Sequence, residues 1–127
     1  MNNCSILIKT KADGVENTVR REGNFSVGET VKICYAEQNA EICLTIENGC
    51  ATIDRKGDYG MCLQLTPHTI TAGTLSISGN QGEIRVETKR VECKQSENGL
   101  RVRLQYALLL GNERQEMQLF IVVKQRK

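Results

Sequence analysis

The sequence offers few side chains that could perform acid–base, nucleophilic or metal chemistry. It contains one histidine, His68, which follows the only proline, Pro67, in a stretch typical of a turn. Cys62 is the cysteine nearest to His68, but it lies inside an alternating strand pattern, and no HxH, HExxH or CxxC spacing accompanies either residue. We therefore expect His68 to be a solvated loop residue. We expect no enzyme, no catalytic residue, no metal site and no cofactor.

The six cysteines are scattered through predicted strands. They are Cys4, Cys34, Cys43, Cys50, Cys62 and Cys93. The first residues lack the basic segment and long apolar run of a secretory signal, and no stretch approaches the roughly 20 apolar residues of a membrane helix. We therefore expect a cytoplasmic protein without a membrane partner, in which all six cysteines are free thiols that act as small hydrophobic residues.

Five polar or aromatic side chains occur in phase with apolar strand faces. Arg21, Glu37 and Arg55 share the parity of apolar neighbours, and so do Tyr35 and Tyr106. If the strands close into a barrel, these side chains point inward or line its mouth, where a charge needs a partner or water. Two interpretations stay open: the three charged residues reach solvent at the rim, or all five form a polar site at the mouth of a ligand-holding barrel.

The elements that would position these residues are predicted by apolar side chains that recur at every second residue. In the segment 100–110, the even positions are leucine, valine or tyrosine, whereas Arg101, Arg103 and Gln105 occupy odd positions. Similar alternation covers 31–35, 42–46, 61–65, 84–93 and 117–123. In the segment 84–93, the phase shifts by one residue between Val86 and Val91, which predicts a β-bulge. We expect eight to ten strands and no helix.

Turn signals separate the predicted strands at short, regular intervals. Asn48-Gly49 and Asn98-Gly99 are typical of hairpin turns with positive φ, and Gly79–Gly82 and Gly111-Asn112 mark two more. Sequential hairpins form a meander, and a meander with one apolar face loses its exposed edges most simply by closing. The sequence therefore predicts a single all-β domain over residues 1–127. We expect a closed or nearly closed antiparallel up-and-down barrel, with a two-sheet sandwich as the alternative.

The charge pattern gives little indication of a polyanionic partner. The chain has 17 lysine and arginine residues against 15 aspartate and glutamate residues, aromatic residues make up 4%, and tryptophan is absent. Glutamates interleave with the basic residues along the sequence, so the strand faces resemble an ordinary mixed-charge surface. We therefore expect no nucleic-acid partner.

Several short segments resemble a known family. They are Arg21-Glu22-Gly23-Asn24-Phe25, Tyr35-Ala36-Glu37, Gly49 to Ile53 with Arg55-Lys56-Gly57, Gly82 to Thr88, and Leu104-Gln105-Tyr106. In this order they resemble the YwiB-like family of small bacterial proteins, a domain of unknown function. The resemblance implies a cytosolic, calycin-like barrel of the lipocalin type, with no activity, cofactor or catalytic residue to carry over. Family members tend to place an aromatic residue shortly before the glycine that corresponds to Gly82, and this chain has none there.

Two functions follow from these expectations. The first is a non-enzymatic barrel that binds a small, partly apolar ligand in its lumen or mouth, through Arg21, Glu37, Arg55, Tyr35 and Tyr106. The second is a protein–protein interaction or accessory module whose barrel is filled by its own side chains. The size of the interior cavity separates them. The sequence does not indicate the ligand, the protein partner or the oligomeric state.

Overall fold

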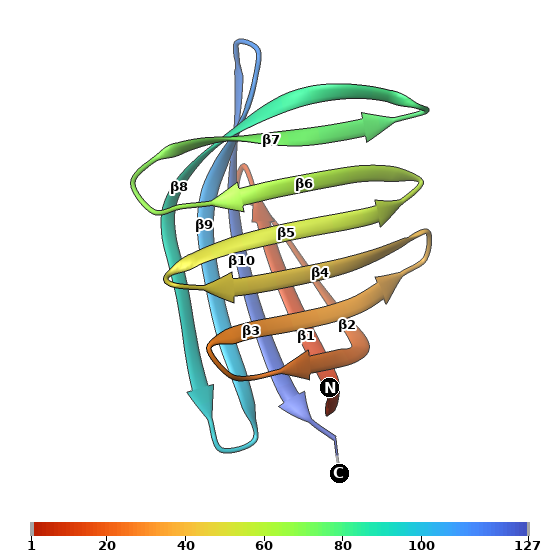
Figure 1. Cartoon of the computed structure of the whole chain (residues 1–127), viewed down its shortest axis with the longest axis vertical. Coiled ribbons are helices and arrows are strands. Elements are labelled where there is room, and N and C mark those ends of the chain that lie inside the picture. The colour runs from red at the N-terminus through yellow and green to blue at the C-terminus, as the bar shows by residue number, and fades with distance from the viewer. Residues whose placement is uncertain (1, 127) are drawn as a thin grey trace.

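Ten antiparallel strands form the whole fold, seen in a computed structural model that describes residues 2–126 (Figure 1). The strands are β1 (Asn2–Ala12), β2 (Val15–Ser26), β3 (Thr30–Glu37), β4 (Ala40–Glu47), β5 (Cys50–Gly57), β6 (Tyr59–Leu65), β7 (Ile70–Ile77), β8 (Asn80–Ser96), β9 (Gly99–Leu110) and β10 (Glu113–Gln125). Each strand pairs with its neighbours in sequence, and β1 pairs with β10 to close the barrel. The predicted all-β up-and-down barrel is confirmed, and this closure excludes the sandwich alternative. Within residues 2–126, no helix has the length and apolar character needed to span a membrane.

The barrel wall has two parts whose strands run in different directions. In Figure 1, β9, β10, β1, the second part of β8 and the first part of β2 run along the molecule, whereas β3 to β7 cross them, together with the start of β8 and the end of β2. The two parts join where β7 pairs with β8 and where β2 pairs with β3, the latter only over Gly23–Ser26. The segment 15–22 of β2 therefore has β1 on one side and no ladder partner on the other.

One end of the barrel, which we call the mouth, carries the turns at 13–14, 38–39, 58, 78–79 and 111–112. Strands that alternate in direction bring every second turn to the same end, so these five turns surround one opening. The end opposite the mouth carries the turns at 48–49 and 97–98 and the connections at 27–29 and 66–69.

The long strand β8 contains the predicted bulge. The register with β9 shifts between Thr88 and Arg90, so Lys89 is the extra residue. Because of this insertion, Thr88 and Val91 both face the interior, although their positions have opposite parity. The phase shift seen in the sequence is therefore confirmed as a bulge that lets one long strand keep its apolar face inward.

Alternating inward side chains fill the barrel away from the mouth. The most deeply buried of them, none more than 1% exposed, include Ile6, Ile33, Leu63, Leu65, Val86, Leu100, Val102, Leu104, Ile121 and Val123. Closer to the mouth the inward apolar residues are only half-buried, among them Val19, Ile42, Met61 and Met117. Most of the interior is therefore a packed core, and its packing is looser toward the mouth.

One cysteine prediction is wrong. Cys34 and Cys43 lie directly opposite each other in the β3–β4 hairpin, with a Cα–Cα distance of 4.2 Å, and form a disulfide. Strand register brings these two residues together, and the sequence pattern does not reveal register at that resolution. Cys4, Cys50, Cys62 and Cys93 are free, as expected.

Reduction of the disulfide should weaken the fold. The bond links residues nine apart, and cross-linking a loop of this size stabilises a protein by about 2–3 kcal/mol in the chain-entropy account. We therefore expect a reductant to lower the midpoint of urea-induced unfolding. The double variant Cys34→Ser/Cys43→Ser should unfold at this lower midpoint with or without reductant. An unchanged midpoint in the wild type would show that the bond contributes nothing to stability.

Candidate binding site at the barrel mouth

A row of inward positions crosses five strands just inside the mouth. In register from β3 to β7, the row consists of Tyr35, Ile42, Arg55, Met61 and Leu75. Tyr35 is buried, and the other four are half-buried. The row therefore combines two polar groups with three apolar side chains that retain contact with solvent, a mixture typical of ligand pockets.

Two tyrosines bring unpartnered hydroxyl groups into this region. Tyr35 and Tyr106 are only 9% and 5% exposed. Within residues 2–126, neither phenol oxygen has a hydrogen-bond partner in the protein. Neither is among the fully enclosed atoms that lack a partner, so both oxygens retain some access to solvent. A buried hydroxyl normally finds a partner, and here water or a ligand has to supply it.

Electrostatic effects act between four of the five predicted site residues. Burial raises the pKa of Tyr35 to about 12, and the charge of Glu37 and the nearby Tyr106 raise it as well, whereas Arg21 acts in the opposite direction. Burial also raises the pKa of Tyr106 to about 12. Both phenols therefore stay protonated at neutral pH, and each can donate a hydrogen bond.

Arg21 and Glu37 lie at the side of the mouth where β2 and β3 separate. Both side chains are half-buried, and Arg21 donates a hydrogen bond of 2.9 Å to the backbone oxygen of Arg20. In the described part of the chain no ion pair joins Arg21 to Glu37. Each charge is therefore available to a polar group of a ligand.

Arg55 has a different role from the other four. Its side chain is 11% exposed, and Nη1 lies 2.8 Å from Oδ1 of Asp58. The same nitrogen donates a hydrogen bond of 2.6 Å to the backbone oxygen of Tyr59, and the guanidinium lies 3.6 Å from the centre of the Tyr59 ring. The hydrogen bond from Arg55 lowers the pKa of Asp58. Through Nη1 and its contact with the Tyr59 ring, Arg55 thus closes the β5–β6 turn and holds the rim.

Thr88 is a buried polar residue, paired with Tyr106, that the sequence analysis did not identify. It is 1% exposed, it pairs with Tyr106 across β8 and β9, and its Oγ1 atom has no hydrogen-bond partner. Its backbone groups are satisfied by the 66–69 connection: Thr88 donates to Thr69, and its oxygen accepts from His68. The predicted bulge lies beside Thr88, and this was the only sequence signal near it.

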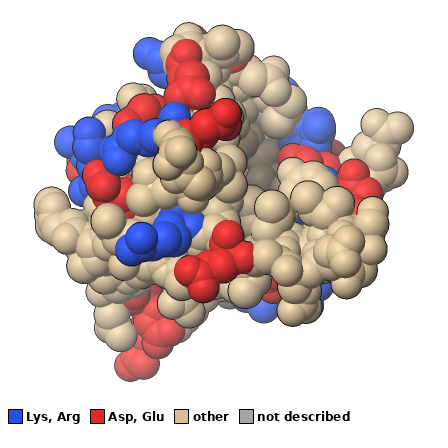
Figure 2. All heavy atoms as spheres, turned by 90° about the horizontal axis from the view of Figure 1, so that it is seen from above, with Lys and Arg blue, Asp and Glu red and all other residues tan. Residues whose placement is uncertain are grey.

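Apolar side chains surround the mouth. The four most exposed of them at this end all have inward parity: Val15, Tyr59, Ile77 and Leu110, between 38% and 72% exposed. Figure 2 shows uncharged side chains over much of the face seen from above, with acidic and basic side chains intermingled beside them. The rim is therefore apolar, and the surrounding surface is not dominated by one charge.

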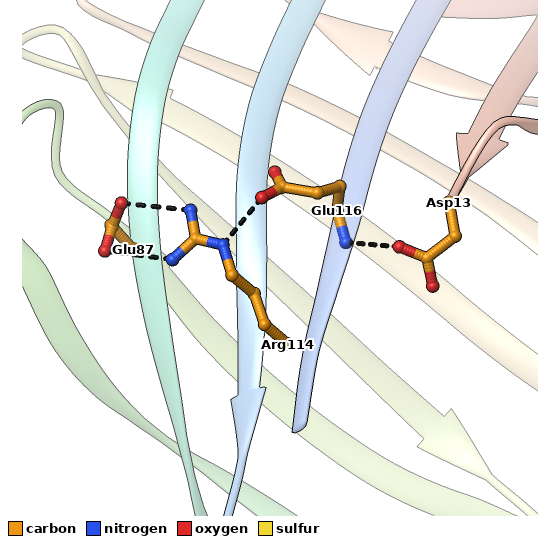
Figure 3. Close-up of polar contacts among 4 residues, drawn as sticks. All are labelled: Asp13, Glu87, Arg114 and Glu116. Carbon is orange, nitrogen blue, oxygen red and sulfur yellow. Dashed lines mark hydrogen bonds and ion pairs between the residues drawn. The ribbon is translucent and has the colours of Figure 1, made fainter. Parts of the chain in front are cut away.

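A charged cluster supports the wall of the long strands (Figure 3). Arg114 on β10 donates two hydrogen bonds, of 3.1 and 3.2 Å, to Glu87 on β8 and one of 2.6 Å to Glu116. The Arg114 hydrogen bonds lower the pKa of Glu87, and the two carboxylates raise the pKa of Arg114. Asp13 accepts a hydrogen bond of 2.9 Å from the backbone of Glu116, so the cluster also links the β1–β2 turn to β10. The cluster thus joins β8, β10 and the β1–β2 turn.

The His68 side chain forms no hydrogen bond or ion pair with the described residues. His68 is exposed, has a φ of 66° in the 66–69 connection, and takes part only through its backbone in the contacts above. Among residues 2–126, no three histidine, cysteine or acidic side chains are grouped as metal ligands.

Comparison with known proteins adds a family and a fold. A family model described as "Domain of unknown function (DUF1934)" matches residues 5–121. The crystal structure of ywiB protein from Bacillus subtilis matches with a TM-score of 0.85 and 17% identity, over 99% of this chain and 93% of that chain. At this identity the likeness shows the shared barrel fold alone. No curated protein matches the chain.

Proposed function

The chain belongs to the DUF1934 family, and on the geometry of its mouth we propose that it is a non-enzymatic binding protein for a small, partly apolar ligand. The observation that carries this proposal is the pair of buried tyrosines whose hydroxyls lack protein partners. A ligand acceptor that replaces water at these hydroxyls contributes a net of about 0.5–1.5 kcal/mol for each hydrogen bond.

The proposed ligand has a polar group and an apolar body. Its polar group accepts hydrogen bonds from Tyr35 and Tyr106, with Arg21 and Glu37 at the edge of the site. Its apolar body packs against half-buried side chains such as Met61 and Leu75. Because the remainder of the interior is filled, the ligand sits in the mouth and does not pass into the barrel.

The alternative is a protein–protein interaction module, and the exposed rim favours it. Val15, Ile77 and Leu110 present apolar surface outside the barrel core, as a docking surface would. For either function we propose the cytoplasm as the compartment, where the four free cysteines stay reduced and the Cys34–Cys43 disulfide is an exception. Fractionation of the producing cells tests that placement.

A fluorescent probe tests the ligand proposal. We expect Nile red, an uncharged dye with an apolar ring system and a carbonyl oxygen, to bind the folded protein with increased fluorescence. Leu75→Arg, which places a charge in the mouth, should weaken binding at least tenfold. Tyr35→Phe and Tyr106→Phe should each weaken it about fivefold, the value of one hydrogen bond.

Ile70→Arg is the matched control. Ile70 is 47% exposed and faces outward on the same strand as Leu75, so probe binding should not change. Equal weakening by Ile70→Arg and Leu75→Arg would contradict a site in the mouth. Native mass spectrometry of fresh protein separates the two functions, because a retained small molecule supports the ligand, whereas a retained polypeptide supports the interaction module.

A further inference from the structure

Basic side chains gather on one outer face of the long strands. The outward positions of three successive rows across β8, β9, β10, β1 and β2 form what we call the basic face. Its cations are Lys9, Lys11, Arg20, Arg90, Lys94, Arg101 and Arg103, and its carboxylates are Glu16 and Glu92. The face thus carries a net charge of +5, whereas the whole chain carries +2, so the rest of the molecule is net negative. Glutamates that interleave with cations in the sequence lie largely on other faces once the strands are in register.

Phe120 lies in the middle of this face. It is half-buried on β10, opposite Arg103 on β9 and Lys9 on β1. The Arg103 guanidinium lies 5.1 Å from the centre of the Phe120 ring, and together they form a ridge. A hollow of about 360 Å³ lies on the side of Lys11, and a second of about 140 Å³ lies on the side of Arg101.

Most of these cations have no protein partner. In the described part of the chain Arg90 is paired with Glu92, at 3.6 Å, whereas Lys9, Lys11, Arg101 and Arg103 form no ion pair. The cations extend over three rows of side chains on five strands, which is wider than one small anion can contact. An extended anionic ligand fits this distribution better.

In place of the expectation from the sequence that no nucleic acid is bound, we propose that the basic face binds single-stranded nucleic acid. Lys9, Lys11, Arg101 and Arg103 contact successive phosphates, and bases enter the two hollows and stack on the Phe120–Arg103 ridge. Unpaired bases can leave a single strand to fill such hollows, whereas bases in a duplex cannot. An acidic protein segment would use the cations, but aspartate and glutamate side chains offer no aromatic ring to stack on the ridge. This site is independent of the site at the mouth, because the basic face lies on the outside of the barrel wall.

Fluorescence anisotropy with a labelled oligothymidylate of about twelve nucleotides tests the proposal. If four phosphates are contacted, raising the salt concentration from about 50 to about 200 mM should weaken binding by about fiftyfold. Phe120→Ala should weaken binding by about fivefold to a hundredfold, as expected for the loss of one stacked base. Arg103→Ala and Lys9→Ala should each lower the slope of affinity against salt concentration.

Lys32→Ala is the matched control, because Lys32 is an exposed outward cation on β3 in the other part of the wall. It should bind like the wild type. Phe120→Leu, which keeps an apolar side chain on β10, should bind as weakly as Phe120→Ala if stacking matters. Equal competition by polyglutamate, or wild-type affinity in both Phe120 variants, would overturn the proposal. Leu75→Arg should leave oligonucleotide binding intact, so failure of the mouth site and failure of the basic face are distinguishable.

Discussion

Gly99→Ala should destabilise the protein by more than about 3 kcal/mol, enough to remove a large part of the stability of a domain this size. Gly99 is buried at the start of β9, opposite Lys124. A Cβ atom at Gly99 would meet the backbone oxygen of Val123 at 1.8 Å and the Val123 carbonyl carbon at 2.9 Å. Neither atom can rotate away, so β9 and β10 would have to separate. Urea-induced unfolding followed by circular dichroism measures the loss.

Gly82→Ala is the control for this prediction. Gly82 also lies in a strand, on β8, but a Cβ atom there would have no neighbour within 4 Å. We expect its free energy of unfolding to be unchanged or slightly raised, since alanine restricts the unfolded chain. If both variants unfold within about 0.5 kcal/mol of the wild type, β9 and β10 do not approach as closely as described.

The strands and their topology could be predicted because each follows from local rules. Leu100 to Leu110 alternates so regularly that one face must be dry, and the slip between Val86 and Val91 has few explanations other than a bulge. Short turns join strands that are adjacent in the sheet, and closure was predicted because it removes the exposed edges of such a meander. The difference in direction between β3–β7 and the long strands left no signal in the sequence, because it depends on where β2 leaves β3.

The sequence analysis located the hairpin turns correctly but gave the wrong reason for one of their glycines. Asn48 and Gly49 have positive φ values of 53° and 76°, as their pairing predicts. Asn98-Gly99 was expected to have the same geometry, but the turn occupies residues 97–98, and neither Asn98 nor Gly99 is among the residues with positive φ. Gly99 is needed for its missing side chain. A conformational need and a steric need for glycine look the same in a sequence.

Features that depend on cross-strand register were not predictable. The Cys34–Cys43 disulfide and the basic face both arise from residues that register places side by side. At the mouth, the five residues were predicted because they are polar or aromatic and lie in phase with apolar strand faces. Electrostatic effects act between four of them. Arg55 instead pairs with Asp58, only three residues away, a contact that parity alone cannot predict. Thr88 could not be identified because the bulge reverses its parity.

High pH should destabilise the folded protein through its two buried phenols. The pKa values of Tyr35 and Tyr106 are about 12 in the folded state, against about 10 for a tyrosine in an unfolded chain. Between these values the unfolded chain releases protons that the folded chain retains, so the free energy of unfolding decreases as pH rises. The loss should start near pH 10 and reach about 2–3 kcal/mol for each tyrosine near pH 12. Below pH 10 the contribution of both groups is fully present.

Urea-induced unfolding at a series of high pH values measures this loss of stability. Substitution of either buried tyrosine should remove a defined share of it. Tyr35→Phe and Tyr106→Phe should each reduce the pH-dependent loss by about half, since a phenylalanine has no proton to release. Tyr59→Phe keeps both buried phenols and should show the full loss. If the single variants lose stability with pH as steeply as the wild type, the phenols are not buried as described. Their hydroxyls would then be too well hydrated to favour a ligand over water, so the mouth proposal depends on the same burial that this titration measures.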